Sequence, residues 1–170
     1  TLVGGVKKSP VDTLRGGYGN DVYIVSRQTD LIEENVDSGT DTILANVGPS
    51  ANKLMAEFSL ANIANVEGLT YTGSSDVSLV GNALDNTING GTSVRNTING
   101  GSGNDYLVGG NKFDELSGGG GHDTLVAGSG VDNMLGGAGN DVYYVDNALD
   151  VVSEKTNEGN DIVYTSASYT

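Results

Sequence analysis

Five consecutive nine-residue blocks, running from Gly100 to Tyr144, keep a single register without a gap. Aspartate occupies the sixth place of every block, at Asp105, Asp114, Asp123, Asp132 and Asp141. A large apolar residue occupies the eighth place, at Leu107, Leu116, Leu125, Met134 and Tyr143. A flexible glycine-rich linker does not hold apolar residues at so strict a spacing, so the run predicts a repeated structural unit.

Each block combines a tight turn with a short strand. Glycine fills most of the first, second and fourth places, and a chain without Cβ atoms turns tightly with its carbonyl groups exposed. The remaining Asp-x-apolar-x piece alternates inward and outward residues, which is the period of a β-strand. Phosphate-binding loops are also rich in glycine, but these loops have aspartate and lack the GK[ST] sequence, which argues against that class.

The pattern resembles the nonapeptide repeat of the RTX, or hemolysin-type, calcium-binding protein family. This resemblance implies an all-β fold, a right-handed parallel β-roll or β-solenoid that calcium stabilises, with two blocks in each turn. Loops two blocks apart then stack on the same edge of the coil. Stacked carboxylates repel one another, and a hard cation held by carboxylate and carbonyl oxygens removes that repulsion.

The expected cofactor is therefore Ca2+, and the expected ligands are sixth-place aspartates and loop glycines. In the glycine run we expect these to be Gly101, Gly103, Asp105, Asp114, Gly119, Gly121, Asp123, Gly128, Gly130, Asp132, Gly137, Gly139 and Asp141. The spacing predicts ions between Asp105 and Asp123, between Asp123 and Asp141, and between Asp114 and Asp132. Asp123 alone is expected to serve two ions.

A second copy of the pattern lies 120 residues upstream: GGYGNDVYIV at 16–25 matches GGAGNDVYYV at 136–145. Such internal similarity is typical of repeat architectures. It extends the list of expected metal ligands to Gly17, Gly19, Asp21, Asp30 and Asp41, and to Asp150 and Asp161. Lys7, Lys8 and Pro10 replace loop glycines, so we expect that first loop to hold no ion.

These patterns divide the chain into a first repeat copy at 1–47, an irregular insert with short strands at 48–80, and a second copy at 81–170, expected to form one continuous solenoid. Residues 48–57 favour a surface excursion with one short helix. Leu79, Ile88 and Ile98 restore the inward register. The corresponding sixth places hold Val77, Asn86 and Asn96, so we expect weak ion sites or none there.

The charge of the chain restricts its partners. It has 22 acidic and 8 basic residues and a net charge of -14, which makes nucleic acids and anionic membranes poor partners. It has no cysteine, and no apolar run approaches the roughly 20 residues of a membrane span. The chain starts in mid-repeat without a signal peptide, which favours a monomeric module of a larger tandem-repeat protein.

We expect a non-catalytic module, and this expectation leaves open whether the protein that carries it is an enzyme. The single histidine, His122, falls in an outward loop position, and no GxSxG or HExxH motif occurs. The resemblance implies type I secretion and folding outside a bacterial cell, where calcium is abundant, so the expected location is extracellular or on the cell surface. An alternative is an accessory module that binds extracellular polysaccharide, for which outward tyrosines at 18, 71, 106, 144, 164 and 169 are suited.

Overall fold

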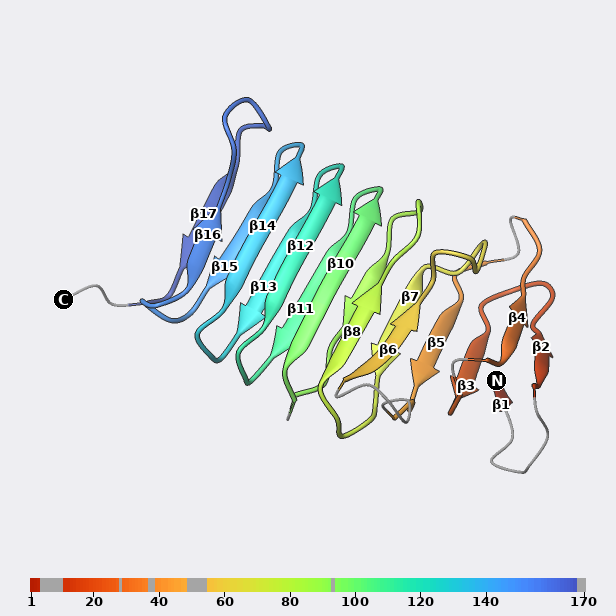
Figure 1. The fold of residues 1–170 in the computed structure, drawn as a ribbon. Coiled ribbons are helices and arrows are strands. Elements are labelled where there is room, and N and C mark those ends of the chain that lie inside the picture. Colours follow the sequence, from red (N-terminus) through yellow and green to blue (C-terminus); the bar gives the residue numbers. More distant parts are fainter. Residues whose placement is uncertain (4–10, 28, 37–38, 49–54, 93, 168–170) are drawn as a thin grey trace.

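The computed structural model describes residues 1–3, 11–27, 29–36, 39–48, 55–92 and 94–167, which form strands and loops without a helix (Figure 1). One sheet has nine strands: β1 (Leu2–Val3), β3 (Val22–Val25), β5 (Thr42–Ala45), β7 (Gly68–Tyr71), β9 (Thr87–Asn89), β11 (Tyr106–Gly110), β13 (Thr124–Gly128), β15 (Val142–Val145) and β17 (Ile162–Thr165). A second has six: β6 (Ala56–Ser59), β8 (Val77–Val80), β10 (Asn96–Ser102), β12 (Glu115–Gly120), β14 (Asn133–Ala138) and β16 (Val151–Ser153). Strands β2 (Thr13–Arg15) and β4 (Leu31–Glu33) form a third sheet.

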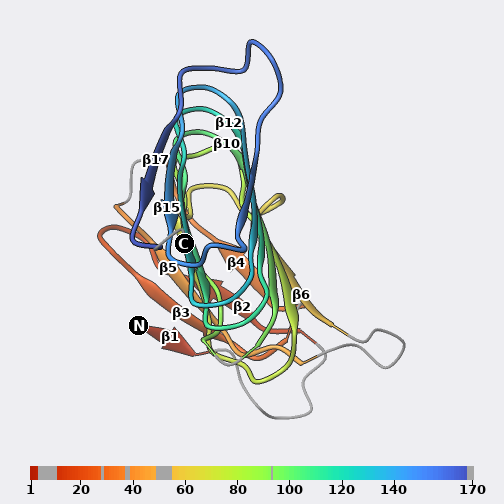
Figure 2. The same ribbon diagram turned by 90° about the vertical axis from the view of Figure 1, so that its left-hand side faces the viewer.

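Successive strands from β5 onward alternate between the two large sheets, so the chain winds as a flattened coil. Every strand pair is parallel, and the register joins residues one turn apart, such as Leu107 with Leu125 and Leu116 with Met134. An end-on view shows the two sheets facing each other as thin layers joined by stacked loops (Figure 2). The expected all-β parallel solenoid is confirmed, and two blocks form each turn through the glycine run.

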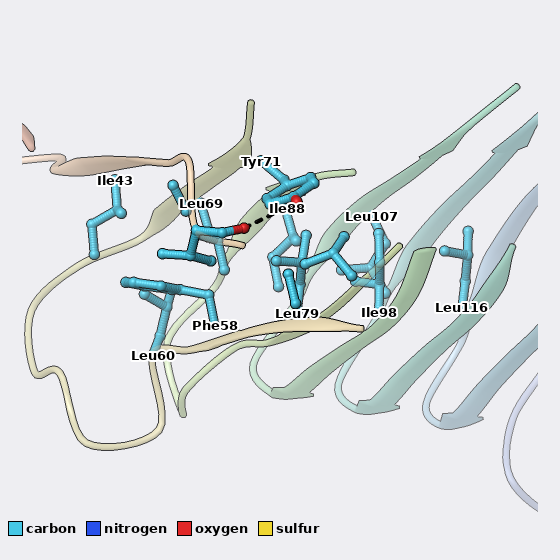
Figure 3. Close-up of a cluster of buried hydrophobic side chains, with 14 of the residues drawn as sticks. Ile43, Phe58, Leu60, Leu69, Tyr71, Leu79, Ile88, Ile98, Leu107 and Leu116 are labelled. Atoms are coloured by element: carbon cyan, nitrogen blue, oxygen red, sulfur yellow. Dashed lines mark hydrogen bonds between the residues drawn. The ribbon is translucent and has the colours of Figure 1, made fainter. Parts of the chain in front are cut away.

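The core is a row of apolar side chains between the two layers (Figure 3). Eighth-place residues such as Leu107 and Leu125 are fully buried, and their neighbours in sequence face outward. Burial of each such side chain contributes roughly 1.5–3 kcal/mol. Each turn supplies few of these residues, so the stability of the coil depends on stacking between turns.

The short helix expected over 48–57 is not supported where the chain is described. Residues 49–54 lie outside the described residues, but Ala56 and Glu57 belong to strand β6 rather than to a helix. Ala56 pairs with Val77 and Phe58 with Leu79, which brings two buried side chains of β6 onto the core. Stacking on β8 thus overrides the helical preference of Ala56 and Glu57. The loop at Lys7–Pro10 also lies outside the described residues.

The last turn is the least covered part of the coil. Val163 continues the inward row of Tyr143, yet 51 % of it is exposed. Ile43, the matching residue in the first copy, is fully buried because β7 pairs with its strand β5. No strand in the described part of the chain pairs with the outer edge of β17.

The described part of the chain also contains no helix that is long and apolar enough to cross a membrane.

Candidate metal centre

The sixth-place aspartates form two rows, one along each edge of the coil. On one edge Asp105 N donates to Asp123 Oδ1 at 2.8 Å, and Asp123 N donates to Asp141 Oδ1 at 2.7 Å. On the other edge Asp114 N donates to Asp132 Oδ1 at 2.7 Å. The structure therefore brings together each pair of aspartates that the spacing placed one turn apart. The bond occupies one carboxylate oxygen of each acceptor.

The second oxygen of these carboxylates has no partner. Among the described residues, seven buried side-chain atoms make no hydrogen bond, and all are aspartate Oδ2 atoms: Asp30, Asp41, Asp105, Asp114, Asp123, Asp132 and Asp141. Every member of the set was an expected metal ligand. A buried polar atom without a partner costs roughly 1–3 kcal/mol, and more when it is charged. Rows of such atoms indicate that a ligand supplies the missing interaction.

Burial makes these carboxylates hard to ionise. It raises the pKa of Asp105 and of Asp132 to about 7 and that of Asp123 to about 6, against an opposing effect of the main-chain hydrogen bond to each. Neighbouring carboxylates of the same row contribute to these raised pKa values. Burial likewise raises the pKa of Asp114 and of Asp141. A bound cation would favour the ionised form at neutral pH.

The glycine loops bring further oxygen atoms to the same edges. Gly101, Gly119 and Gly137 have φ values of 112°, 113° and 99°, in the left-handed region that favours glycine. A Cβ atom on Gly119 would collide with the carbonyl oxygen of Gly101 one turn below. One on Gly118 would collide with Asp123 Oδ2. The loops thus pack carbonyl and carboxylate oxygens closely, with no room for a side chain.

Most of the glycines expected as ligands adopt the expected turn conformation. Positive φ values occur at Gly17, Gly19, Gly101, Gly103, Gly119, Gly121, Gly128, Gly137 and Gly139. Gly130 does not share the positive φ, and Gly110, which was not expected as a ligand, has a φ of 159°. The role of these glycines as metal ligands remains a prediction.

The donor set fits calcium. Within the described ranges no three side chains of His, Cys, Asp or Glu gather into a metal-binding cluster. A cation on either edge would therefore be held by individual carboxylates together with main-chain carbonyls. Oxygen-only coordination with several carbonyls is what Ca2+ accepts, whereas zinc prefers nitrogen and sulfur.

The N-terminal copy reproduces the arrangement with fewer members. Asp21 N donates to Asp41 Oδ1 at 2.7 Å, and Asp12 N donates to Asp30 Oδ1 at 3.3 Å. Burial raises the pKa of Asp41, and nearby Glu34 and Glu67 raise it further. The partners of Asp21 and Asp30 thus come from the first copy itself. Asp150 and Asp161 accept the matching bonds from Asp132 N and Asp141 N at 2.9 Å each.

Sequence reasoning missed a second ladder, formed by fifth-place residues on the Asp105 edge. Asn104 N donates to Asp85 Oδ1, His122 N to Asn104 Oδ1, and Asn140 N to His122 Nδ1, each at 2.7 Å. His122 is exposed, as expected, but it is a rung of this ladder. The signal was the recurrence of polar side chains with an acceptor atom at that place of alternate blocks.

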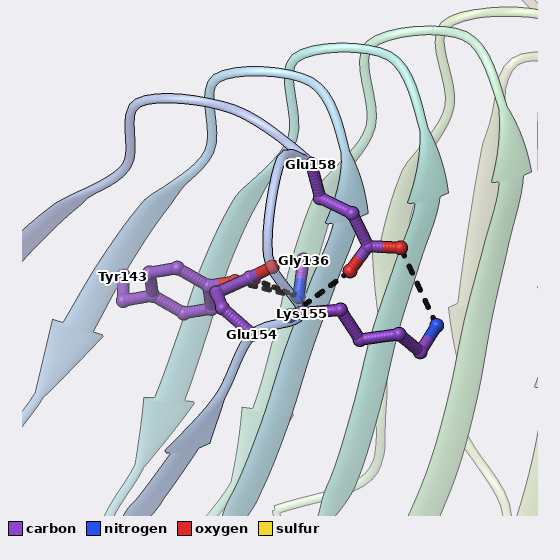
Figure 4. Close-up of polar contacts among 5 residues, drawn as sticks. All are labelled: Gly136, Tyr143, Glu154, Lys155 and Glu158. Carbon is purple, nitrogen blue, oxygen red and sulfur yellow. Dashed lines mark hydrogen bonds and ion pairs between the residues drawn. The ribbon is translucent and has the colours of Figure 1, made fainter.

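A pair formed by a buried tyrosine and a more exposed glutamate ends each copy of the repeat and was also missed. Tyr143 OH donates to Glu154 Oε1, which also accepts from Gly136 N at 3.0 Å (Figure 4). In the first copy Tyr23 OH and Gly16 N donate to Glu34 in the same way. Glutamate here takes the first place of a block, where the glycine run has Gly, so matching glutamates 120 residues apart were the available signal.

One of the tyrosines expected to face outward is buried. Tyr71 is 3 % exposed, its OH donates to Val47 O at 3.1 Å, and it pairs with the small Ala45 on β5. Both Leu69 and Tyr71 are buried, because they are two apart on β7 and Ala45 leaves room for the ring. The other described tyrosines of that group are exposed: Tyr18, Tyr106, Tyr144 and Tyr164. Tyr169 lies outside the described residues.

A comparison with protein-family models gave one match, to the RTX calcium-binding nonapeptide repeat, at residues 11–32, 80–114 and 108–143. These segments together cover half of the chain and include both aspartate rows. No curated protein and no solved structure matched. The repeat blocks, the parallel coil, the aspartate rows and the family match agree: the chain belongs to the family of RTX calcium-binding nonapeptide repeat proteins, whose repeats bind Ca2+.

Proposed function

We propose that this calcium-binding module folds its C-terminal turns only when calcium binds, as part of a secreted or cell-surface bacterial protein. The observation that carries the proposal is the set of buried aspartate Oδ2 atoms without a partner. A chain with such a set gains little from folding until a cation supplies the missing contacts. Ions that bind only the folded form shift the equilibrium by mass action.

The ligands in this proposal are the aspartates of the two rows and the carbonyl oxygens of the loops between them. One ion bridges Asp105 and Asp123, a second bridges Asp123 and Asp141, and a third bridges Asp114 and Asp132. Calcium supplies positive charge that balances the stacked carboxylates. The chain contributes the rest: the glycines allow close stacking, and the main-chain N–H groups fix the orientation of each carboxylate.

Calcium dependence suits a chain that is exported before it folds. Free calcium is scarce in the cytosol and abundant outside the cell, so the turns would stay unfolded until secretion was complete. The net charge of -14 acts in the same direction, because self-repulsion disfavours the compact form when no cations are bound. The module itself has no catalytic role in this proposal.

The direct test is a calcium titration followed by circular dichroism and by isothermal titration calorimetry, with magnesium as the control. We expect strand signal to appear with calcium, to vanish with a chelator, and to respond poorly to magnesium, which prefers fewer ligands in a rigid octahedron. We also propose an ion at the N-terminal pair Asp21 and Asp41, which share the main-chain bond of the rows, so a double variant, Asp21→Ala with Asp41→Ala, should bind fewer ions than the parent. A strand signal that ignores calcium altogether would refute the proposal.

Binding of an uncharged extracellular polysaccharide is a second candidate, favoured by one surface feature. Tyr144 and Tyr164 stack with ring centroids 5.3 Å apart on the outer face of the nine-stranded sheet. Each is about half exposed, and exposed aromatic rings suit sugar contacts. A glycan array probed with the calcium-loaded module, and with a Tyr144→Ala, Tyr164→Ala control, tests this candidate.

A further inference from the structure

Each aspartate row begins on an asparagine. Asn86 N donates to Asp105 Oδ1 at 2.8 Å on one edge, and Asn96 N donates to Asp114 Oδ1 at 2.7 Å on the other. Both asparagines are as buried as the aspartates, at 2 % and 0 % exposed. Unlike the aspartates, neither has a buried side-chain atom without a partner.

The Asn96 amide lies in a shell of oxygen atoms. Its nitrogen is 3.0 Å from Gly91 O, 3.3 Å from Val94 O, 3.2 Å from Gly109 O and 2.9 Å from Asp114 Oδ1. Its own oxygen accepts from Gly91 N at 2.8 Å. This environment fixes the orientation of the amide, because four acceptors face the nitrogen and a donor faces the oxygen. The shell joins two successive loops, as a cation between them would.

Asn86 makes the equivalent connection on the other edge, toward the preceding turn. Its nitrogen lies 3.1 Å from Asn82 Oδ1 and 3.4 Å from the carbonyl oxygens of Val66 and Glu67. Asn82 adds bonds from its own nitrogen to Ile63 O at 3.1 Å and Val66 O at 2.9 Å. The side-chain amides of Asn82 and Asn86 thus connect the loop after β8 to the loop before β7 by hydrogen bonds.

We propose that the side-chain NH2 groups of Asn86 and Asn96 replace the calcium ion in these two loops. A partially positive NH2 group attracts the same carbonyl oxygens that a cation would coordinate, and unlike an aspartate at this place it adds no negative charge to the shell. The turns from β6 through β11, which these amides connect, therefore fold without calcium. They form a permanent template on which calcium adds the turns from β12 onward, a role that rests on the proposed function.

Hydrogen exchange in chelator tests the template directly. We expect amides of β7, β8 and β9 to stay protected without calcium, while those of β13, β15 and β17 exchange freely until calcium is added. If β7 to β9 exchange as fast as β13 in a chain that does respond to calcium, the template is refuted. Protection of β13 and β15 in chelator would instead refute the proposed function.

A charge change tests the role of the amide itself. Asn96→Asp places a carboxylate in the oxygen shell and should add one calcium ion to the stoichiometry measured by calorimetry. It should also remove protection from β8 and β9 in chelator. The matched control is Asn99→Asp, which adds the same charge on the exposed face of the same strand and should change neither readout. A folded Asn96→Asp protein with the parent stoichiometry would refute the assignment.

A third variant covers the possibility that Asn96→Asp does not fold. Asn96→Ala removes the NH2 group without adding charge, so it should lower the unfolding midpoint in calcium and in chelator alike. Asp123→Ala, by contrast, should lower the midpoint only in calcium, because the turn that it affects is already unfolded in chelator. Equal behaviour of the two variants would mean that Asn96 is one more calcium-dependent position.

Discussion

Two matching segments, 11–47 in the first copy and 131–167 in the second, share their local bonds but differ in what lies next to them. Asp21 N bonds to Asp41 in the first copy, and Asp141 N bonds to Asp161 in the second; both copies pair a tyrosine with a glutamate. In the first segment, β5 pairs with β7 of the next turn, which covers its inward side chains. The second segment contains Asp132 and Asp141, the last aspartates of the two rows. Every position of its last strand, β17, is exposed.

The difference shows that burial in this coil is a property of neighbouring turns rather than of the sequence of one turn. Similar residues are buried in one copy and exposed in the other, as Ile43 and Val163 are. In a repeat protein each turn interacts only with the turns beside it. The stability of the second segment should therefore depend on calcium bound by the aspartate rows, whereas the stability of the first depends on its pairing with β7.

The largest expected effect is that Asp123→Ala unfolds the second copy and leaves the first intact. Asp123 is the middle member of its row, so its loss removes a ligand from two proposed ions and leaves Asp105 and Asp141 uncompensated. Loss of one partner of a buried charged contact costs about 3–5 kcal/mol. We expect the calcium midpoint for folding, measured by circular dichroism, to rise at least about tenfold, since about 1.4 kcal/mol corresponds to a factor of ten.

The matched control for this variant is Asp85→Ala. Asp85 Oδ1 accepts a main-chain bond of the same kind, from Asn104 N at 2.7 Å, but its exposed side chain has no orphaned oxygen. The control variant should keep the parent calcium midpoint. If Asp85→Ala and Asp123→Ala fold at the same calcium concentration, the ladder bond and not the cation accounts for the effect. Hydrogen exchange then shows which copy has opened.

A second prediction uses the matching core residues Ile43 and Val163. Ile43→Ala should cost about 2–5 kcal/mol, because it leaves a cavity between β3 and β7. Val163→Ala should cost less than about 0.5 kcal/mol, because its side chain is half exposed in the parent. Urea unfolding in saturating calcium measures both. Similar losses would show that β17 is covered in solution, which contradicts the comparison.

Much of this fold was predictable from the sequence because its determinants are periodic. A strict spacing fixes which residues face inward, and a turn of two blocks fixes which aspartates meet. The failures came where contacts between turns decided the outcome. Ala56 and Glu57 form a strand because β8 lies beside them, and Tyr71 is buried because Ala45 is small. Neither neighbour is close in sequence, so local propensity and composition carry no trace of them.

The third prediction concerns pH and the buried carboxylates of the two aspartate rows. Burial raises the pKa of Asp105 and of Asp132 to about 7, well above the roughly 3.9 of an unfolded chain. Without calcium, any folded form of these turns then binds more protons than the unfolded chain does between about pH 4 and pH 7, so its stability falls as pH rises through that window. Turns that are unfolded without calcium hold few of these protons above about pH 4, so the apparent calcium affinity should fall only as pH drops toward about 4.

Calorimetry in buffers of different ionisation enthalpy measures the protons that are released on calcium binding. Near pH 6 we expect little proton release from the parent, because its calcium-free turns are unfolded and their aspartates are already ionised. Asp132→Asn should give the same small value. Clear proton release at this pH from the parent, reduced by Asp132→Asn, would mean that the turns are already folded, with protonated aspartates, before calcium binds.

The smallest expected effect compares the two tyrosine–glutamate pairs. Tyr23→Phe and Tyr143→Phe each remove one donor from a glutamate that keeps its bond from a glycine N–H. Glu34 is partly buried whereas Glu154 is exposed, so water replaces the lost bond more readily at Glu154. We expect a loss of about 1–2 kcal/mol for Tyr23→Phe and about 0.5–1 kcal/mol for Tyr143→Phe in urea unfolding. Tyr18→Phe, at a side chain that is 90 % exposed, should change nothing. Equal losses of stability for Tyr23→Phe and Tyr143→Phe would show that neighbouring turns do not set the strength of these hydrogen bonds. The difference between the two copies would then apply only to the burial of apolar side chains.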